Sequence, residues 1–256
     1  MKKVKAMMFV TTLIFALLFA STVLAQDTTI TILHTNDIHG RFISTNTTIG
    51  IDTIAAIYAE IENAILVDAG DTFHGLPFVT LNQGLSAVEL MNLSGYSFFT
   101  PGNHDFNYGL DRLLELEDMA EFGFLSANIY RGGELLFNDI AVVEIEGVTV
   151  GFFGLATPNT THLTNPANVI DLTFGDPIDA AKRSVAILQD KGVDIIVALG
   201  HLGSGARNAH TIDGWAIDVA LAVPEIDVII DGHSHSVHET GELVNGVLIV
   251  QAGVVF

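Results

Sequence analysis

The sequence predicts an α/β protein with a largely parallel sheet. Short apolar, β-rich runs alternate with segments in which apolar residues recur at helical spacing, and polar residues directly follow several of the runs. The carboxyl ends of parallel strands are where such sheets present their ligands. We expect strands over residues 29–35, 64–68, 96–99, 124–128, 140–145, 148–155, 193–199, 228–231 and 247–250, and helices over 51–61, 85–93, 110–122, 176–189 and 212–223.

Local signals justify individual elements. Residues 29–35 alternate Thr, Ile and Leu in a pattern typical of a strand, and residues 64–68 form a buried-type run that leads into Ala-Gly-Asp. Glu146-Gly147 separates two β-rich runs and indicates a hairpin. Asp176-Pro177 combines an acidic cap with a proline in the first turn, which favours a helix start. No repeat or linker interrupts the pattern, so one large domain is expected.

The first 25 residues are expected to be a signal peptide. Lys2, Lys3 and Lys5 precede an apolar run over residues 7–20, and Ala25 supplies the small residue at a cleavage site. A membrane anchor is the alternative, although the run is short for a span of about 20 residues. We therefore expect a catalytic domain over residues 26–256, located in the periplasm or secreted, with no membrane association after cleavage.

Charge and cysteine content exclude several functions. Residues 26–256 hold seven Lys and Arg against thirty Asp and Glu, a net charge of −23, which argues against binding a nucleic-acid polymer or anionic lipid through a basic surface. An acidic protein can still act on phosphates where bound cations reverse the local field. The chain contains no cysteine, which rules out disulfides, thiolate ligands and a cysteine nucleophile.

The stretch Gly102-Asn103-His104-Asp105 carries the clearest chemical signal. It places an amide beside an imidazole after a strand-like run, which suits metal ligation by Asn103 and proton donation to a phosphate by His104. Comparable polar residues follow four other runs, namely Asp37 and His39, Asp71, His201, and His233 with His235. Tight turns are expected at Gly40, Gly70, Gly102, Gly200 and Gly232.

This inventory predicts two divalent metal ions. Two carboxylates, one amide and four imidazoles supply mixed oxygen and nitrogen ligands, which suit Zn, Mn, Fe or Co without deciding among them. Two such ions can hold a nucleophilic hydroxide and clamp a phosphoryl group. Asp71 is the candidate for a carboxylate shared by both ions.

Five ordered motifs give the chain a family resemblance. Through residues 33–40, 68–75, 102–106, 200–201 and 231–235, it resembles the calcineurin-like metallophosphoesterases, and within them the bacterial 5'-nucleotidase and 2',3'-cyclic-nucleotide 2'-phosphodiesterase branch. The resemblance implies a four-layer αββα sandwich. It also implies one metal on Asp37, His39, Asp71 and His235, a second metal on Asp71, Asn103, His201 and His233, and a catalytic role for His104.

The resemblance leads us to expect an exported, metal-dependent phosphoric ester hydrolase acting on nucleotides or similar small phosphate esters. Two departures matter: Asn107 replaces the Asp that orients the catalytic histidine in many 5'-nucleotidases, and the family's C-terminal specificity domain is not expected in this sequence. The alternatives are a nucleotide-sugar or thiosulfate-ester hydrolase of the same superfamily, and a truncated, non-catalytic metal-binding remnant. No obligate protein partner is evident.

Two further residues are candidates for substrate contact. Arg41 lies two positions after His39, where a phosphate contact competes with a surface salt bridge, and His74 lies three positions after Asp71. His34, His162, His210 and His238 are interpreted as structural histidines. Asp68, Asp105 and Asp231 are interpreted as carboxylates that support the ligands or cap backbone amides, and Phe98, Phe99, Phe152 and Phe153 as core residues.

Overall fold

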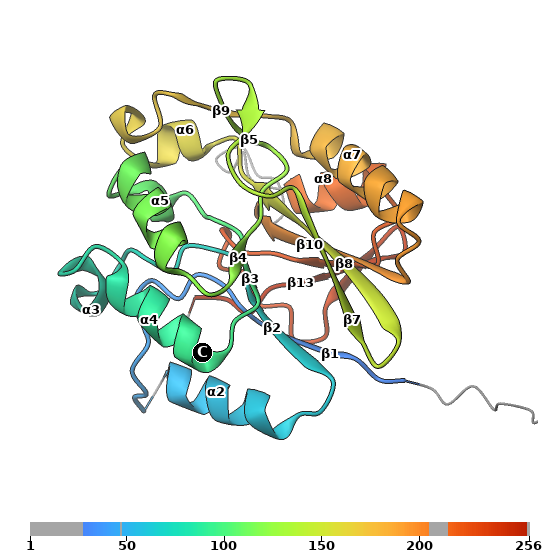
Figure 1. Cartoon of the computed structure of the whole chain (residues 1–256), viewed down its shortest axis with the longest axis horizontal. Coiled ribbons are helices and arrows are strands. Elements are labelled where there is room, and N and C mark those ends of the chain that lie inside the picture. Colours follow the sequence, from blue (N-terminus) through green and yellow to red (C-terminus); the bar gives the residue numbers. More distant parts are fainter. Residues whose placement is uncertain (1–27, 47, 205–214, 255–256) are drawn as a thin grey trace, which may run out of the picture.

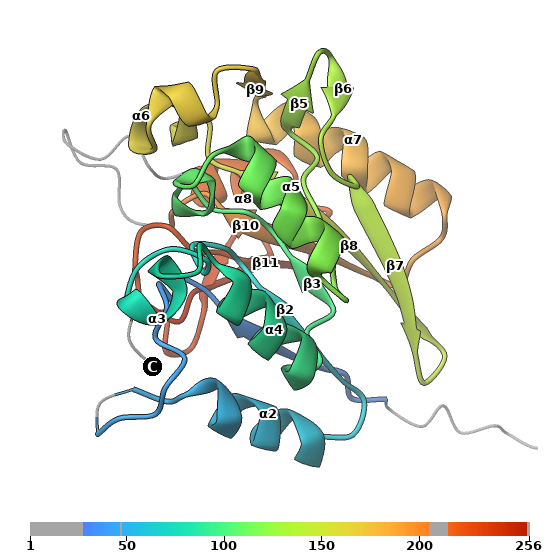
Figure 2. The same ribbon diagram turned by 60° about the vertical axis from the view of Figure 1, so that its left-hand side comes forward.

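The computed structural model describes residues 28–46, 48–204 and 215–254, so the expected signal peptide lies outside the described residues. Two β-sheets pack face to face, and helices cover the outer face of each (Figures 1 and 2). The expected four-layer αββα sandwich is therefore confirmed. No helix among the described residues has the length and apolar character needed to cross a membrane.

The first sheet has four parallel strands in the order β1-β2-β3-β4. Its strands are β1 (Thr31–Thr35), β2 (Ala64–Asp68), β3 (Phe98–Phe99) and β4 (Gly123–Phe124). Its outer face is covered by α2 (Ile51–Glu60), α4 (Leu85–Ser94) and α5 (Leu110–Met119). Each of these helices starts at the residue that the sequence predicts.

The second sheet has six strands in the order β12-β13-β11-β10-β8-β7, with antiparallel strands at both edges. They are β7 (Ile140–Ile145), β8 (Val148–Ala156), β10 (Ile195–His201), β11 (Val228–Ile230), β12 (Glu242–Val244) and β13 (Val247–Val250). Helices α7 (Pro177–Asp190) and α8 (Trp215–Ala222) cover its outer face. The carboxylate of Asp176 caps α7 by accepting from the amides of Ile178 and Asp179, as expected.

Alternation along the strands builds the three hydrophobic layers. In β8, the side chain of Phe152 faces the first sheet, whereas Phe153 faces α7 and α8. In β2, Ile65 and Val67 enter the layer between the sheets, and Leu66 packs beneath the helices of the first sheet. Successive side chains of a strand point to opposite faces of its sheet, and both faces of the central strands are covered. The central strands are therefore apolar on both faces.

A third, small sheet and several short helices were not predicted. The sheet joins β5 (Ile129–Arg131), β6 (Glu134–Leu135) and β9 (Leu172–Phe174), and the short helices are α3 (Pro77–Thr80), η1 (His104–Phe106), α6 (Thr160–Leu163) and η2 (Pro166–Asn168). The predicted strand over 124–128 was wrong in its bounds. The ladder ends at Phe124, and the buried side chain of Asn128 instead bonds to the end of β8.

Candidate metal centre

The predicted ligands meet at one edge of the sandwich, beyond the carboxyl ends of strands from both sheets. Asp37 and His39 follow β1, Asp71 follows β2, and Asn103 follows β3. His201 is the last residue of β10, and His233 and His235 follow β11. Their acid and imidazole groups form two clusters, in each of which the ligand atoms lie within 4.8 Å of one another. We call Asp37, His39 and His235 the first cluster, and Asp71, His201 and His233 the second cluster.

The first cluster runs from the buried carboxylate of Asp37 to the exposed imidazole of His235. The imidazole of His235 is 43% exposed and its Nε2 lies 3.4 Å from Oδ1 of Asp37. The Nε2 atoms of His39 and His235 are themselves 3.4 Å apart. On its other side, Nδ1 of His39 faces the backbone carbonyl of His74 at 3.2 Å, which leaves Nε2 directed into the cluster.

The second cluster is more deeply buried. The side chain of His201 is fully buried and that of Asp71 is 2% exposed, with Nε2 of His201 at 3.2 Å from Oδ2 of Asp71. Nδ1 of His201 lies 2.7 Å from the backbone carbonyl of Ala69, to which it donates. That bond fixes the ring and leaves Nε2 as the metal-facing atom.

Asp71 lies between the clusters. Its Oδ2 is 3.2 Å from His201 and 3.9 Å from His39 of the first cluster. Its Oδ1 accepts from the backbone amide of His104 at 2.7 Å, so the second oxygen is the one directed toward both clusters. This is the arrangement that a carboxylate shared by two cations needs.

The buried polar atoms of the site fit a pair of divalent cations. Oδ1 of Asn103 is buried and accepts no hydrogen bond from any described residue. A buried acceptor without a partner is costly, and a cation would satisfy it. Carboxylate, imidazole and amide oxygen together form a donor set suited to Zn, Mn, Fe or Co.

The backbone at the ligands is strained. Nine non-glycine residues in the described ranges have positive φ, and five of them are the candidate ligands Asp37, His39, Asp71, His233 and His235. Such conformations cost about 1–3 kcal/mol each and persist where surrounding contacts over-determine them. At these positions the candidate ligands themselves, and not glycines, adopt the left-handed backbone of the turn.

The prediction that the five glycines beside the ligands serve tight turns was only partly right. Gly40 and Gly70 have positive φ, but Gly102, Gly200 and Gly232 do not. A Cβ on Gly232 would lie 2.8 Å from Nδ1 of His201 and 2.9 Å from the carbonyl of Ala69. Here a side chain is excluded because two ligand-bearing segments approach closely.

Three buried carboxylates hold the ligand loops. The carboxylate of Asp105 accepts from the backbone amides of Asp71, Thr72, Phe73 and Gly102 at 2.8–3.0 Å, and so fixes the loop that presents Asp71. Asp68 accepts from the amide of Gly70, and Asp231 accepts from the amide of Leu202. Burial raises the pKa of each of these carboxyls to about 7, although the hydrogen bonds oppose the shift. Their interpretation as supporting groups agrees with these contacts.

The charges of the second cluster are coupled. Burial is the largest single influence and would raise the pKa of Asp71 and lower that of His201, but the attraction between these two groups, together with the other charges and hydrogen bonds of the site, outweighs it. The pKa of Asp71 therefore lies below its usual range, and that of His201 is raised to about 10. In the metal-free protein the two groups form a buried ion pair. In the first cluster, burial lowers the pKa of His39, whereas the hydrogen bond with Asp37 raises that of His235.

His104 borders the clusters. Its ring centroid lies 5.3 Å from that of His39, and its Nδ1 lies 2.9 Å from Nδ2 of Asn107. Oδ1 of Asn107 accepts from the hydroxyl of Thr164 at 2.9 Å. Because Thr164 occupies the carbonyl side of the Asn107 amide, the NH₂ group of that amide faces His104. Nδ1 of His104 therefore accepts this hydrogen bond, and the N–H of the neutral ring lies at Nε2.

The structure brings both candidate substrate contacts to this region. His74 stacks on His104 at a centroid distance of 5.7 Å and an interplanar angle of 9°, and its ring also contacts Tyr108. The guanidinium of Arg41 is directed to the carbonyl of Ile38 at 3.5 Å, and no carboxylate in the described ranges pairs with it.

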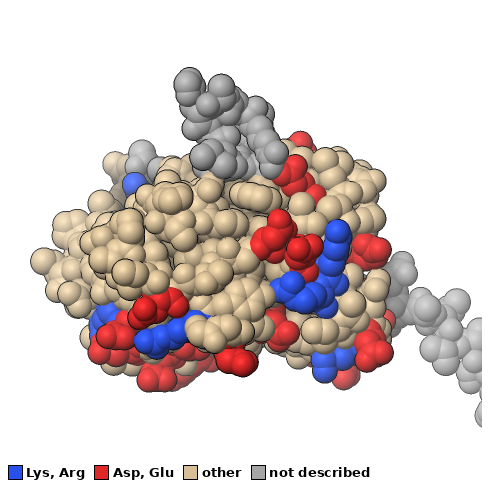
Figure 3. Space-filling view, turned by 90° about the horizontal axis from the view of Figure 1, so that it is seen from above, with Lys and Arg blue, Asp and Glu red and all other residues tan. Residues whose placement is uncertain are grey.

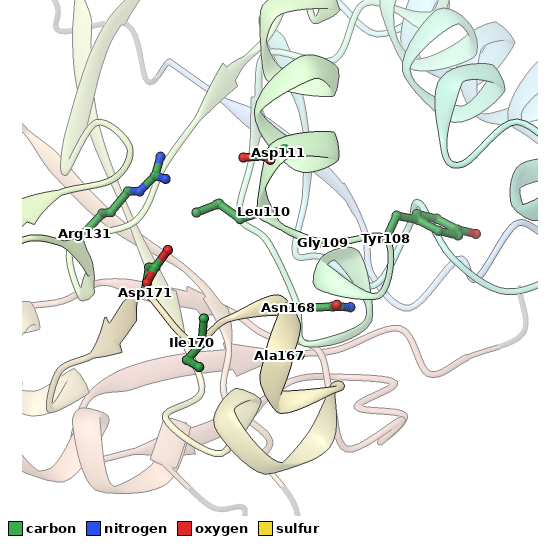
Figure 4. Close-up of a pocket in the computed structure, with 9 residues that line it drawn as sticks. All are labelled: Tyr108, Gly109, Leu110, Asp111, Arg131, Ala167, Asn168, Ile170 and Asp171. Atoms are coloured by element: carbon green, nitrogen blue, oxygen red, sulfur yellow. The ribbon is translucent and has the colours of Figure 1, made fainter.

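A polar cavity of about 250 Å³ adjoins the turn that carries His104 (Figure 4). It is lined by Tyr108 and the start of α5 on one side and by residues 167–171 on the other, with the charged groups of Asp111, Arg131 and Asp171 at one end.

Seen from above the molecule, most Lys and Arg side chains lie beside Asp or Glu and form no separate basic patch on that face (Figure 3).

Two residues that touch the ligand loops were missed. Asn36 and Gln251 are both buried amides that hydrogen-bond to these loops. Asn36 directly precedes Asp37, and Gln251 stands as a single polar residue after an apolar run. A buried amide next to a candidate ligand is the signal that could have found them.

Comparisons with known proteins agree with this geometry. The sequence profile of the family described as Calcineurin-like phosphoesterase matches residues 30–237. A 5'-nucleotidase of Vibrio vulnificus is 33% identical over 227 residues, which cover 82% of this chain and 41% of that protein. The chain thus spans about two-fifths of the length of this relative.

Two solved structures show the same architecture. The 5'-nucleotidase precursor of Thermus thermophilus superposes with a TM-score of 0.76 at 30% identity, covering 88% of this chain and 48% of that one. The calcineurin-like phosphoesterase YfkN of Bacillus subtilis superposes with a TM-score of 0.75 at 26% identity, covering 88% of this chain and 81% of that one.

Proposed function

The chain belongs to the calcineurin-like phosphoesterase family, and we propose that it hydrolyses nucleotides or similarly small phosphate esters with two divalent cations. The observation that carries this proposal is the position of Asp71, whose Oδ2 lies between His201 of one ligand cluster and His39 of the other. Relatives named 5'-nucleotidase support nucleotides as the substrate class.

We assign the ligands as the clusters group them. Asp37, His39, Asp71 and His235 would hold one cation, and Asp71, Asn103, His201 and His233 the other. When bound, divalent cations supply Lewis-acid chemistry: they neutralise phosphate charge and generate a nucleophile from water near neutral pH. The donor set suits Zn, Mn, Fe or Co.

His104 is proposed as the catalytic residue that faces the phosphate. Asn107 and Thr164 orient the ring so that the Asn107 amide faces Nδ1, which leaves Nε2–H to hydrogen-bond a phosphate oxygen. Protonation of the leaving alkoxide would use the imidazolium form, which returns to neutral imidazole after the transfer. Arg41 and His74 are proposed to contact the substrate.

Phosphate release tests the proposal directly. Purified protein supplied with Mn²⁺ or Zn²⁺ is assayed on AMP, UMP, cyclic AMP, a nucleotide sugar, a thiosulfate ester and an aryl phosphate, with the Asp71→Ala variant as the control for contaminating phosphatases. We expect metal-dependent release from the nucleotides that is lost in the variant. Faster turnover of the nucleotide sugar or the thiosulfate ester would select that alternative instead. No turnover of any substrate would favour the non-catalytic metal-binding protein.

We also propose that the protein is exported and cleaved after Ala25, on the basis of the charged and apolar pattern of residues 1–25. Expression of the whole chain in a bacterial host should give a periplasmic or secreted product that begins at Gln26. Mass spectrometry of the recovered protein checks the cleavage site, and a full-length product in the membrane fraction would contradict it.

A further inference from the structure

Asn36 connects the first cluster to the segment that follows β13. Its side chain is fully buried. Its Nδ2 donates to Oδ2 of Asp37 at 2.7 Å and to the carbonyl of Gly253 at 2.8 Å, and its Oδ1 accepts from the amide of Ala252 at 2.9 Å. One amide therefore holds a ligand carboxylate of the first sheet against a segment of the second.

Gln251, at the start of that same segment, holds the loop that carries His233 and His235. Its side chain is 2% exposed. Its Oε1 accepts from the amide of Ser236 at 2.5 Å and from the hydroxyl of Ser234 at 3.1 Å, and its Nε2 lies within 3.1 Å of the carbonyl of Gly232, Oδ2 of Asp231 and Oγ of Ser204. These partners bracket both histidines on either side in sequence.

The residues held in this way are the strained ones. Asp37, His233 and His235 have φ of 51°, 75° and 53°, in the left-handed region that side chains disfavour. The imidazole of His235 is 43% exposed, so packing around its ring contributes little to its placement. The ring is then placed by its contact with Asp37 and by the hydrogen bonds that hold the backbone on either side of it.

We propose that Gln251 and Asn36 are positioning residues that preorganise the first cluster for a metal ion by locking its strained loops onto the segment over residues 251–253. The inference rests on the proposed function, because it takes the first cluster as a metal site. Neither amide contacts the reacting phosphate; each acts through the ligands that it holds.

The second cluster depends less on these amides, which hold only one of its three members, His233. His201 is oriented by the carbonyl of Ala69, and the Asp71 loop is fixed by the carboxylate of Asp105. In the first cluster, Asn36 holds Asp37 and Gln251 holds the loop of His235. Loss of these amides should therefore weaken metal binding more at the first cluster than at the second. Partners in the shell around metal ligands typically change metal affinity by about 10- to 100-fold.

The test compares Gln251→Ala with Asn128→Ala. Asn128 is also a fully buried amide, and it bonds to the backbone of Ala156 and Gly175 without touching a ligand loop. Both variants lose comparable hydrogen bonds and should lose comparable stability. Calorimetric titration with Mn²⁺, well below the melting temperature of either variant, gives the affinity of each site in folded protein. A third variant, Asn36→Ala, tests the same cluster through Asp37 instead of His235, which matters if Gln251→Ala does not fold.

We expect Gln251→Ala and Asn36→Ala each to weaken one Mn²⁺ site by about 10- to 100-fold, while Asn128→Ala stays within about twofold of wild type. Unchanged Mn²⁺ affinity in both Gln251→Ala and Asn36→Ala would overturn this inference and leave the proposed function standing. An equal loss of affinity in Asn128→Ala would also overturn it, because the effect would then reflect a general loss of stability. Wild-type protein that bound no Mn²⁺ and no Zn²⁺ would overturn the proposed function and this inference with it.

Discussion

The second cluster of Asp71, His201 and His233 is the more deeply buried one, whereas the first cluster of Asp37, His39 and His235 opens to solvent. In the second cluster, His201 is the last residue of β10 and is fully buried, while Asp71 and His233 lie in loops with positive φ. In the first cluster, all three ligands lie in such loops, and one ring is 43% exposed. We therefore expect the second cluster to be the more rigid site and the first the more adaptable one, and we expect them to differ in metal retention.

The largest effect is expected at Asp71, which lies between the clusters and is proposed to bind both cations. Asp71→Ala removes the carboxylate between them and leaves His201 buried without its ionic partner, so both metal ions and nearly all turnover should be lost. Metal analysis of the dialysed variant together with a phosphate-release assay measures this. Two ions still bound would end the assignment of Asp71 as the shared ligand.

Single-histidine variants separate the clusters. His235→Ala should lose one ion and keep the other, because the second cluster contains none of its contacts. His201→Ala should lose the more tightly held ion and also lower stability, because it leaves Asp71 with an uncompensated buried charge. The metal content that remains after treatment with increasing concentrations of a chelator shows which of the two sites holds its ion more tightly. If His201→Ala retained its ions longer than His235→Ala, the comparison of rigid and adaptable sites would be reversed.

His104→Ala should leave the metal content of both clusters unchanged. The side chain is outside both ligand groups, and the backbone amide that donates to Asp71 survives the substitution. We expect turnover to fall by roughly 10²- to 10⁴-fold, the usual size of an acid–base contribution.

A series of esters with increasingly good leaving groups checks the origin of that loss. Better leaving groups need less protonation, so the loss should shrink along the series. The same loss for every ester would remove the role of His104 as a proton donor and leave only stabilisation of phosphate charge.

The smallest expected effect is a pH dependence of the unfolding free energy that comes from His34 in β1, the strand that leads to the first cluster. Burial lowers the pKa of His34 from 6.5 to about 4, so the folded protein holds this imidazole neutral while the unfolded chain takes up a proton below pH 6.5. Its contribution to the unfolding free energy is therefore complete above pH 6.5 and decreases as the pH falls toward 4. Between pH 7 and pH 5 the loss should be about 1–2 kcal/mol.

His34→Leu isolates this contribution. Nδ1 of His34 is buried and has no hydrogen-bond partner among the described residues, and the nearby cavity is lined by Leu33, Ile54 and Leu66 among other apolar side chains. Leucine therefore removes the titrating group without breaking a hydrogen bond. Urea unfolding of both proteins at pH 7 and pH 5 should show a smaller pH dependence in the variant, and equal pH dependence would refute the assignment.

Local patterns determined much of the fold. The bounds of β2, β7 and β13 agree with the predicted runs, since a short β-rich stretch that ends at a polar or charged residue leaves little freedom. The hairpin at Glu146 and Gly147 was also correct, and both residues have the positive φ that a tight turn between twisted strands needs. By contrast, β5, β6 and β9 are only two or three residues long, and β5 pairs with the distant β9, so no local pattern could indicate this sheet.

From the sequence alone the candidate ligands could be found, because each lies at or just after an apolar strand, and the family resemblance implied two sets. How the candidate ligands are held depends on the tertiary structure. Asn36 meets Gly253 across 217 positions, and His201 meets the carbonyl of Ala69 across 132. Asp105 holds the loop of Asp71 across 34 positions, and Gln251 holds the backbone beside His235 across 15. No local pattern indicates these partners, because they become neighbours only when the strands that carry or precede them pair in one sheet or pack from one sheet onto the other.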